Sequence, residues 1–289
     1  MLDLGQIAFA IINGLVFGSI LALIAVGLSL IYGVLDVPNF AQGEFATLSG
    51  FIVVGLMGFG LGLVPSIIVA IVAAVVAGIA LERLVIARFY GREEFLLLTF
   101  FATFGVTIIS ENAHQMIFGG FRQIQGPELG TISLVGSTYS LLNVLSGVFA
   151  IIMIIGLYIF TKYTYTGLAM RAVADDQTGT EILGINYGRI YMVTFALGGA
   201  LTGISGILYG MSYTLSPTLG VLLTLFAFTI VVVGGIGSFQ GAIIASFLVG
   251  LVESFASTFI GSQWRLFAVF FLLFVVLILR PQGIGGVRS

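Results

Sequence analysis

Six long stretches of this chain contain no Asp, Glu, Lys or Arg, and this absence of charge most limits what the chain can fold into. The stretches are 4–35, 45–81, 95–110, 129–161, 190–252 and 266–279. An α-helix needs about 20 mostly apolar residues to cross the hydrocarbon core of a bilayer. The stretches therefore predict several membrane spans, with more than one in 190–252. Hydrophobic residues make up 59% of the 289 residues and charged residues only 8%, which is typical of a protein buried in lipid.

Turn residues and charges divide the chain into nine apolar segments. The expected segments are 9–32, 43–62, 65–87, 95–117, 141–161, 190–211, 219–236, 240–259 and 264–280. We therefore predict an all-α polytopic integral membrane protein with about 8–10 transmembrane helices, some of them broken or re-entrant. All of it is expected to form a single transmembrane domain over residues 1–289.

The positions of Lys and Arg predict how the chain is oriented, because these residues concentrate in cytoplasmic loops. Eight of the ten fall on one side of the predicted segments and two on the other. The eight are Arg83, Arg88, Arg92, Lys162, Arg171, Arg189, Arg280 and Arg288, and the two are Arg122 and Arg265. We predict that the 82–94 loop, the 162–189 segment and the C-terminus are cytoplasmic and that the N-terminus lies outside.

Two segments, 33–44 and 234–241, combine polar residues with glycine between apolar neighbours. Pro38 cannot continue a helix and Gly43 loosens the backbone, so a break between half-helices is expected in the first. Broken helices at matching places in two halves often mark a translocation path, whereas an ordinary cytoplasmic turn is the alternative for each segment. The candidate path residues are Asn39, Gln42, Gly43, Glu44, Gly237, Ser238 and Gln240. A shared pattern suggests an internal repeat, with Phe40, Gln42 and Gly43 matching Phe239, Gln240 and Gly241.

The polar stretch from Lys162 to Arg189 predicts two short helices between two spans. Thr166 can cap the first helix, and Asp175 or Asp176 can cap a second helix that ends at Gly184. A chain that only needs to turn around uses a few residues. This helical elbow therefore predicts a docking site for another protein.

Few ionisable residues lie in the apolar segments. Glu44, Glu111 and Glu253 each lie near a segment end or a polar neighbour, where solvation can suffice. We expect His114 to be a polar residue at the outer end of its span, because a metal site needs companion ligands; a proton relay is the alternative. The chain has no Walker A loop, no Gly-x-Ser-x-Gly and no His-Glu-x-x-His, so we predict no catalytic residue, no metal site and no cofactor bound by this chain.

Four motifs in this order resemble the permease subunits of branched-chain amino-acid ABC importers, of the LivH type. They are Gly33–Glu44, Thr166–Ala172 continuing to Leu183–Ile185, Gly234–Gly241 and Arg280–Gly283. The resemblance covers nearly the whole chain and implies the ABC importer permease fold. The family usually has His where Gln42 stands, so no role that depends on an imidazole is expected there.

The resemblance implies alternating-access transport of branched-chain or related amino acids across the cell membrane, driven by partner subunits. The implied partners are a homologous second permease, two cytoplasmic ATPases that bind ATP and Mg, and an external solute-binding protein, with no nucleic acid. The ATPase-coupling segment would be 164–187, with Arg171, Asp175, Glu181, Gly184 and Ile185 as contact or shape residues. A urea or short-amide permease, a stand-alone secondary carrier and a membrane enzyme are the alternatives.

Overall fold

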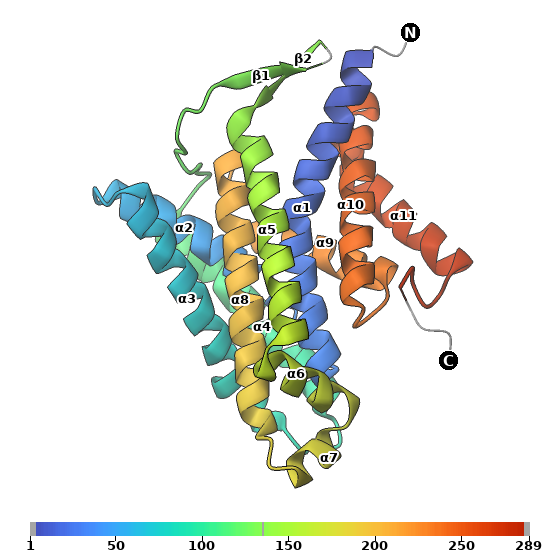
Figure 1. The fold of residues 1–289 in the computed structure, drawn as a ribbon. Coiled ribbons are helices and arrows are strands. Elements are labelled where there is room, and N and C mark those ends of the chain that lie inside the picture. Colours follow the sequence, from blue (N-terminus) through green and yellow to red (C-terminus); the bar gives the residue numbers. More distant parts are fainter. Residues whose placement is uncertain (1–3, 135, 286–289) are drawn as a thin grey trace.

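A long central helix, α1 (Leu4–Leu35), organises the fold in the computed structural model, which describes residues 4–134 and 136–285 (Figure 1). Every residue from Ile20 to Ala25 is completely buried. Four helices pack around α1: α5 (Leu141–Tyr163), α8 (Tyr187–Ser212), α9 (Leu219–Gly234) and α10 (Phe239–Phe255). The sequence of α1 is apolar on every face, which suits a helix that contacts other helices on all sides.

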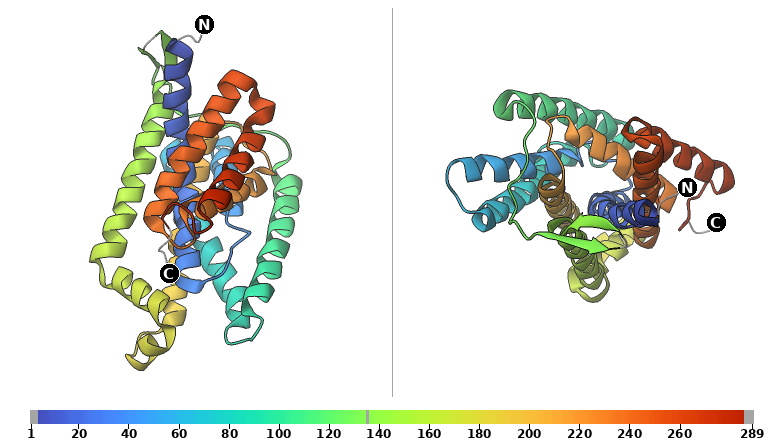
Figure 2. Two further views of the ribbon diagram at one scale, coloured as in Figure 1. Left: turned by 90° about the vertical axis from the view of Figure 1, so that its right-hand side faces the viewer. Right: turned by 90° about the horizontal axis from the view of Figure 1, so that it is seen from above.

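Four further helices flank this group on three sides, as the view from above in Figure 2 shows. The helices are α2 (Glu44–Gly58), α3 (Leu63–Leu84), α4 (Phe95–Phe118) and α11 (Arg265–Leu279). Single turns are η1 (Ile86–Phe89), η2 (Ala256–Ile260) and η3 (Ser262–Trp264). A hairpin that the sequence analysis did not anticipate precedes α5, with β1 (Thr131–Leu134) antiparallel to β2 (Ser137–Ser140).

Seven helices in the described residues are long and apolar enough to cross a membrane. The prediction of an all-α polytopic membrane protein with broken segments is confirmed, but two expected spans, 43–62 and 219–236, are wrong. They form α2, with 15 residues, and α9, with 16, and at about 1.5 Å per residue neither covers a hydrocarbon core of about 30 Å. Both begin inside the protein, since Glu44 and Leu219 are each 3% exposed.

Small residues let the helices approach closely. A Cβ added at Gly250 of α10 would overlap the backbone of Gly14 and Gly18 on α1, and one added at Gly199 of α8 would overlap the carbonyl oxygen of Ala74 on α3. Dispersion and weak hydrogen bonds act at such short backbone separations. These glycines therefore serve packing within this chain.

The elbow consists of α6 (Tyr165–Asp175) and α7 (Gln177–Ile182), at the end of the bundle opposite the N-terminus and the hairpin (Figure 1). Thr164, and not the predicted Thr166, caps α6 by accepting a hydrogen bond of 3.1 Å from the amide of Gly167. Thr164 has the extended backbone of an N-cap residue, whereas Thr166 already lies inside the helix. Asp176 caps α7 as predicted, because its Oδ1 accepts a hydrogen bond of 2.9 Å from the amide of Gly179.

The 82–94 loop lies beside the elbow end of α8. The ring of Tyr90 contacts those of Tyr187 and Tyr191, with centroids 6.4 and 5.3 Å apart, and its hydroxyl donates to Glu82 at 2.7 Å. Burial and this hydrogen bond raise the pKa of Tyr90, which keeps the donor protonated. Two segments rich in Lys and Arg thus share one end of the bundle. Arg288 lies outside the described residues.

We predict that Gly206→Ala destabilises the protein, because its Cβ would overlap the backbone of Ala46 where α8 crosses α2. The expected loss in the free energy of unfolding is about 1–3 kcal/mol, measured by thermal unfolding in a neutral detergent. Gly156→Ala on α5 is the matched control, since nothing lies within 4 Å of its Cβ. Equal melting temperatures for the two variants would show that the crossing of α8 and α2 accommodates the added methyl group.

Candidate functional site

The chain is irregular at two places, each just before a short helix. Residues 36–43 separate α1 from α2, and residues 213–218 separate α8 from α9. The first break begins at Asp36, whose left-handed backbone (φ 56°) ends α1, and Pro38 prevents the helix from resuming. The predicted break in 33–44 is confirmed.

The amides of the first break are hydrogen-bonded to side chains. The amide of Phe40 donates a hydrogen bond of 3.3 Å to Oγ1 of Thr103 on α4. The amide of Ala41 donates to Oδ1 of Asn39 at 3.1 Å, within the break itself. The amide of Gly43 donates to Oγ1 of Thr224 on α9 at 2.9 Å. Irregular backbone at membrane depth is tolerated only where protein or a cavity pairs its polar groups. These contacts therefore allow the break to exist inside the bundle.

Two predicted path residues, Asn39 and Gln42, form a buried amide network. Both side chains are 0% exposed. Asn39 donates to Oε1 of Gln42 at 2.9 Å, and Gln42 donates to Thr202 at 2.6 Å and to the carbonyl of Gly198 at 3.2 Å. Because Gly198 and Thr202 lie on α8, this network fastens the break to that helix.

The N-terminal ends of α2 and α9 meet at Gly43 and Gly220. A Cβ at Gly43 would overlap the carbonyl oxygen of Gly220, and a Cβ at Gly220 would overlap the carboxylate of Glu44. The hydroxyl of Thr224 lies 2.8 Å from the Gly220 carbonyl and 3.3 Å from that of Phe40. Only glycine fits at both positions of this contact.

Glu44 and His114 are a buried acid–base pair, which corrects two predictions. Glu44 is 3% exposed and His114 is 5% exposed, so neither is solvated at a segment end. Nδ1 of His114 lies 3.2 Å from Oε2 of Glu44. The positive end of the α2 dipole also favours a carboxylate in its first turn. Glu253 is likewise buried and is paired with Arg265 at 3.1 Å.

The buried face of α4 is polar, and sequence reasoning missed it. Its buried residues are Thr99, Thr103, Thr107 and His114. Hydroxyls four residues apart lie on one helical face, so their spacing was a usable signal. The α4 face contributes Thr103 to the break and His114 to Glu44.

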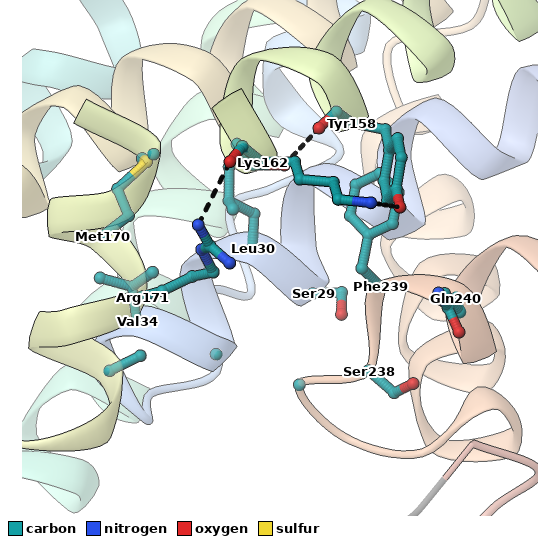
Figure 3. A pocket seen from close by; sticks show the side chains of 15 residues that line it. Ser29, Leu30, Val34, Tyr158, Lys162, Met170, Arg171, Ser238, Phe239 and Gln240 are labelled. Carbon is teal, nitrogen blue, oxygen red and sulfur yellow. Dashed lines mark hydrogen bonds between the residues drawn. The ribbon is translucent and has the colours of Figure 1, made fainter. Parts of the chain in front are cut away.

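The other predicted path residues, Gly237, Ser238 and Gln240, lie elsewhere. They line a cleft of about 480 Å³ at the elbow end, together with residues of α1, α5 and α6 (Figure 3). Among those residues is Arg171, which the sequence assigned to coupling. The two predicted sets of path residues are thus separate, and one of them adjoins the elbow.

The two copies of the suggested repeat do not occupy equivalent positions in the structure. Gln42 lies in the irregular break and is completely buried. Gln240 is exposed in the first turn of α10. A shared pattern of three residues therefore does not correspond to a shared position.

The predicted coupling residues all lie on the elbow, but they face differently. Asp175 and Glu181 are exposed. Arg171 is also exposed, and its Nη2 turns back to donate to the Lys162 carbonyl at 3.3 Å. The φ of +81° at Gly184 ends α7 as predicted. The amide of Ile185 donates to the backbone carbonyl oxygen of Thr180 at 3.0 Å, which completes a Schellman motif.

The elbow has a buried inner face and an apolar tip. Ala169, Met170 and Val173 are at most 4% exposed and pack in a cluster with residues of α1 and α8. Ile182 and Leu183 at the tip are 82% and 79% exposed. Large exposed apolar side chains at a membrane protein's aqueous end are unfavourable unless something covers them. This apolar tip was not predicted from the sequence.

Comparisons with known proteins cover nearly all of the chain. Residues 10–279 match a family model described as branched-chain amino acid transport system / permease component. The high-affinity branched-chain amino acid transport system permease protein BraD of Pseudomonas aeruginosa is 34% identical, over 96% of this chain and 94% of its own length. The corresponding permease protein LivH of Salmonella typhimurium is 32% identical, over 95% and 94%.

A solved structure has a similar fold. It is PsaBC from Streptococcus pneumoniae in complex with Fab, with a TM-score of 0.52 and 11% sequence identity. The match covers 93% of this chain and 91% of that chain.

We predict that Thr224→Val lowers both stability and transport, because the buried amide of Gly43 loses its acceptor. An unpaired buried donor costs about 1–3 kcal/mol. Thr229→Val is the matched control, since Thr229 is equally buried on α9 and bonds only to the Leu225 carbonyl of its own helix in the described structure. Thermal unfolding and solute uptake are measured for both, and indistinguishable variants would contradict the assigned role of Thr224.

Proposed function

Because this chain belongs to the family of permease components of branched-chain amino acid transport systems, we propose that it carries branched-chain or related amino acids across the cell membrane as the membrane-spanning subunit of an ABC importer. The chain itself is not an enzyme, and ATP is hydrolysed on partner ATPases. The partners we propose are a homologous second permease, two cytoplasmic ATPases and an external solute-binding protein. With this arrangement the elbow end faces the cytoplasm and the N-terminus lies outside.

The shape of the elbow is the observation that carries this proposal. Its tip exposes Ile182 and Leu183, which an ATPase groove would cover. Helix α6 at the other end of the elbow is held in place, because Met170 and Val173 pack against α1 and α8. A force applied at the tip therefore reaches the helices of the bundle.

Alternating access follows from this connection. Closure of the ATPase pair on ATP would displace the elbow and, with it, α1 and α8. Gln42 ties α8 to the first break, so movement of α8 changes the surroundings of Asn39 and Gly43. ATP biases the two conformations only to the extent that its affinity differs between them.

The pair of Glu44 and His114 favours one alternative, a proton-coupled carrier that acts alone. An intramembrane acid–base pair is a frequent part of proton relays. Uptake in proteoliposomes distinguishes the two functions. We expect uptake of leucine, in the presence of the solute-binding protein and the ATPases, to persist with a proton uncoupler and to stop when ATP is withdrawn. The reverse pattern would establish the carrier, and uptake of urea or short amides in place of leucine would reassign the substrate.

We predict that Gly184→Val uncouples transport from ATP hydrolysis. The left-handed backbone at Gly184 (φ +81°) resists a β-branched residue, while nothing within 4 Å blocks the added atoms. A strain of about 1–2 kcal/mol shifts the equilibrium between the native elbow and a relaxed conformation by roughly tenfold. Because only the native elbow would transmit the movement, we expect a fall in solute transported per ATP hydrolysed of about the same size. Both rates are measured in the reconstituted complex.

Gly91→Val is the matched control, because Gly91 has a similar φ of +75° and equally open surroundings. It lies between η1 and α4, outside the elbow. We expect this variant to keep the wild-type ratio of transport to hydrolysis. Wild-type coupling in Gly184→Val would remove the elbow from the proposed mechanism.

A further inference from the structure

The cleft at the elbow end is formed by elements far apart in the sequence. Its walls come from the last turns of α1 and α5, from α6, and from the turn before α10 (Figure 3). The cleft is amphipathic, since Leu30, Val34, Met170 and Phe239 line it beside several polar groups. It therefore suits a ligand that has a polar head and an apolar body.

The charge of the cleft is positive. Lys162, the only lysine in the chain, and Arg171 both line it, and none of its fifteen described lining residues is acidic. Lys162 extends toward the ring of Tyr158 and donates to its hydroxyl at 3.1 Å. Within the described residues Arg171 makes one hydrogen bond, to a backbone carbonyl, so most of its five N–H donors are free for an anion.

Ser29 provides an independent indication of a ligand. Its side chain lines the cleft from α1 and is 1% exposed. Its hydroxyl has no hydrogen-bond partner in the described part of the chain. Buried hydroxyls are normally paired, and this one lies between the two sides of the cleft (Figure 3). A bound polar head would satisfy it.

An exposed apolar stripe leads along α5 to the cleft. Val148, Ile151 and Ile155 are 48%, 40% and 51% exposed. They are followed at the same helical spacing by Tyr158 and Lys162, which line the cleft. The stripe and the cationic end form one continuous surface, with the tyrosine at the level where aromatic rings meet lipid headgroups.

We propose that the cleft binds the phosphate headgroup of an anionic phospholipid, with an acyl chain along the α5 stripe. Lys162 and Arg171 would hold the phosphate, and Ser29 would donate to the headgroup. Basic pockets between transmembrane helices bind such headgroups by this chemistry. The stripe favours a lipid over a soluble phosphate, because it places the acyl chains of the bilayer directly beside the cationic end of the cleft. The lipid would bridge α6 of the elbow and α10, and would stiffen the connection between them.

Native mass spectrometry of the full-length chain tests this site. The purified protein is released from micelles that contain equal amounts of phosphatidylglycerol and phosphatidylcholine, and the retained lipids are counted. We expect the wild type to retain phosphatidylglycerol preferentially. Lys162→Gln and Arg171→Gln should each weaken this preference about fivefold, and Ser29→Ala should weaken it as well.

Two variants serve as controls. Arg189→Gln removes an exposed cation of α8 that does not line the cleft, and should retain phosphatidylglycerol like the wild type. Lys162→Arg keeps the charge and should also do so. Thermal unfolding in neutral detergent verifies that the variants are folded.

The proposal is overturned if Lys162→Gln and Arg171→Gln retain as much phosphatidylglycerol as the wild type, or if Arg189→Gln loses as much as they do. Inorganic phosphate is added to lipid-free protein as a further arm. If it raises the melting temperature as much as phosphatidylglycerol does, the site belongs to a soluble anion and the lipid assignment fails. These readouts do not involve transport, so they are independent of which solute the chain carries.

Discussion

The contact between the end of the first break and α9 is the constraint on which the interior of this protein depends. Chain that leaves a helix at membrane depth exposes amides that lipid cannot pair. Here Thr224 accepts the amide of Gly43, and Gly220 lets the two backbones touch. Thr103 of α4 likewise accepts the amide of Phe40. Both α4 and α9 are therefore fixed to the segment that leads into α2.

This arrangement separates two tasks along the length of the bundle. The break, with its amide network and the pair of Glu44 and His114, lies buried among α2, α4, α8 and α9. The elbow lies at one end and is attached through its buried face to α1 and α8. Helix α8 therefore belongs to both regions, and α1 leads directly into the break. A movement of the elbow is thus transmitted to the break through the packing of these two helices.

Several features were predictable because they depend on short-range chemistry. Pro38 cannot continue a helix beyond its first turn, Asp176 can cap the next turn with its own side chain, and Gly184 favours the left-handed end of α7. The predicted N-cap of α6 was wrong, because two nearby residues can serve as the cap. Thr164 and Thr166 are both good caps, and only the path of the chain out of α5 selects the first.

The pattern of residues was enough to show that the chain lies in a membrane, where its long helices run, and that a polar elbow with its own caps separates two of them. The packing of the helices was needed to show that α2 and α9 start inside the protein, because an apolar run looks the same whether lipid or protein surrounds it. It also decided that His114 lies against Glu44 from a distant helix. It further placed Arg171 across a cleft from Ser238. Such pairings depend on how helices pack, and hydropathy and local propensity carry no information about them.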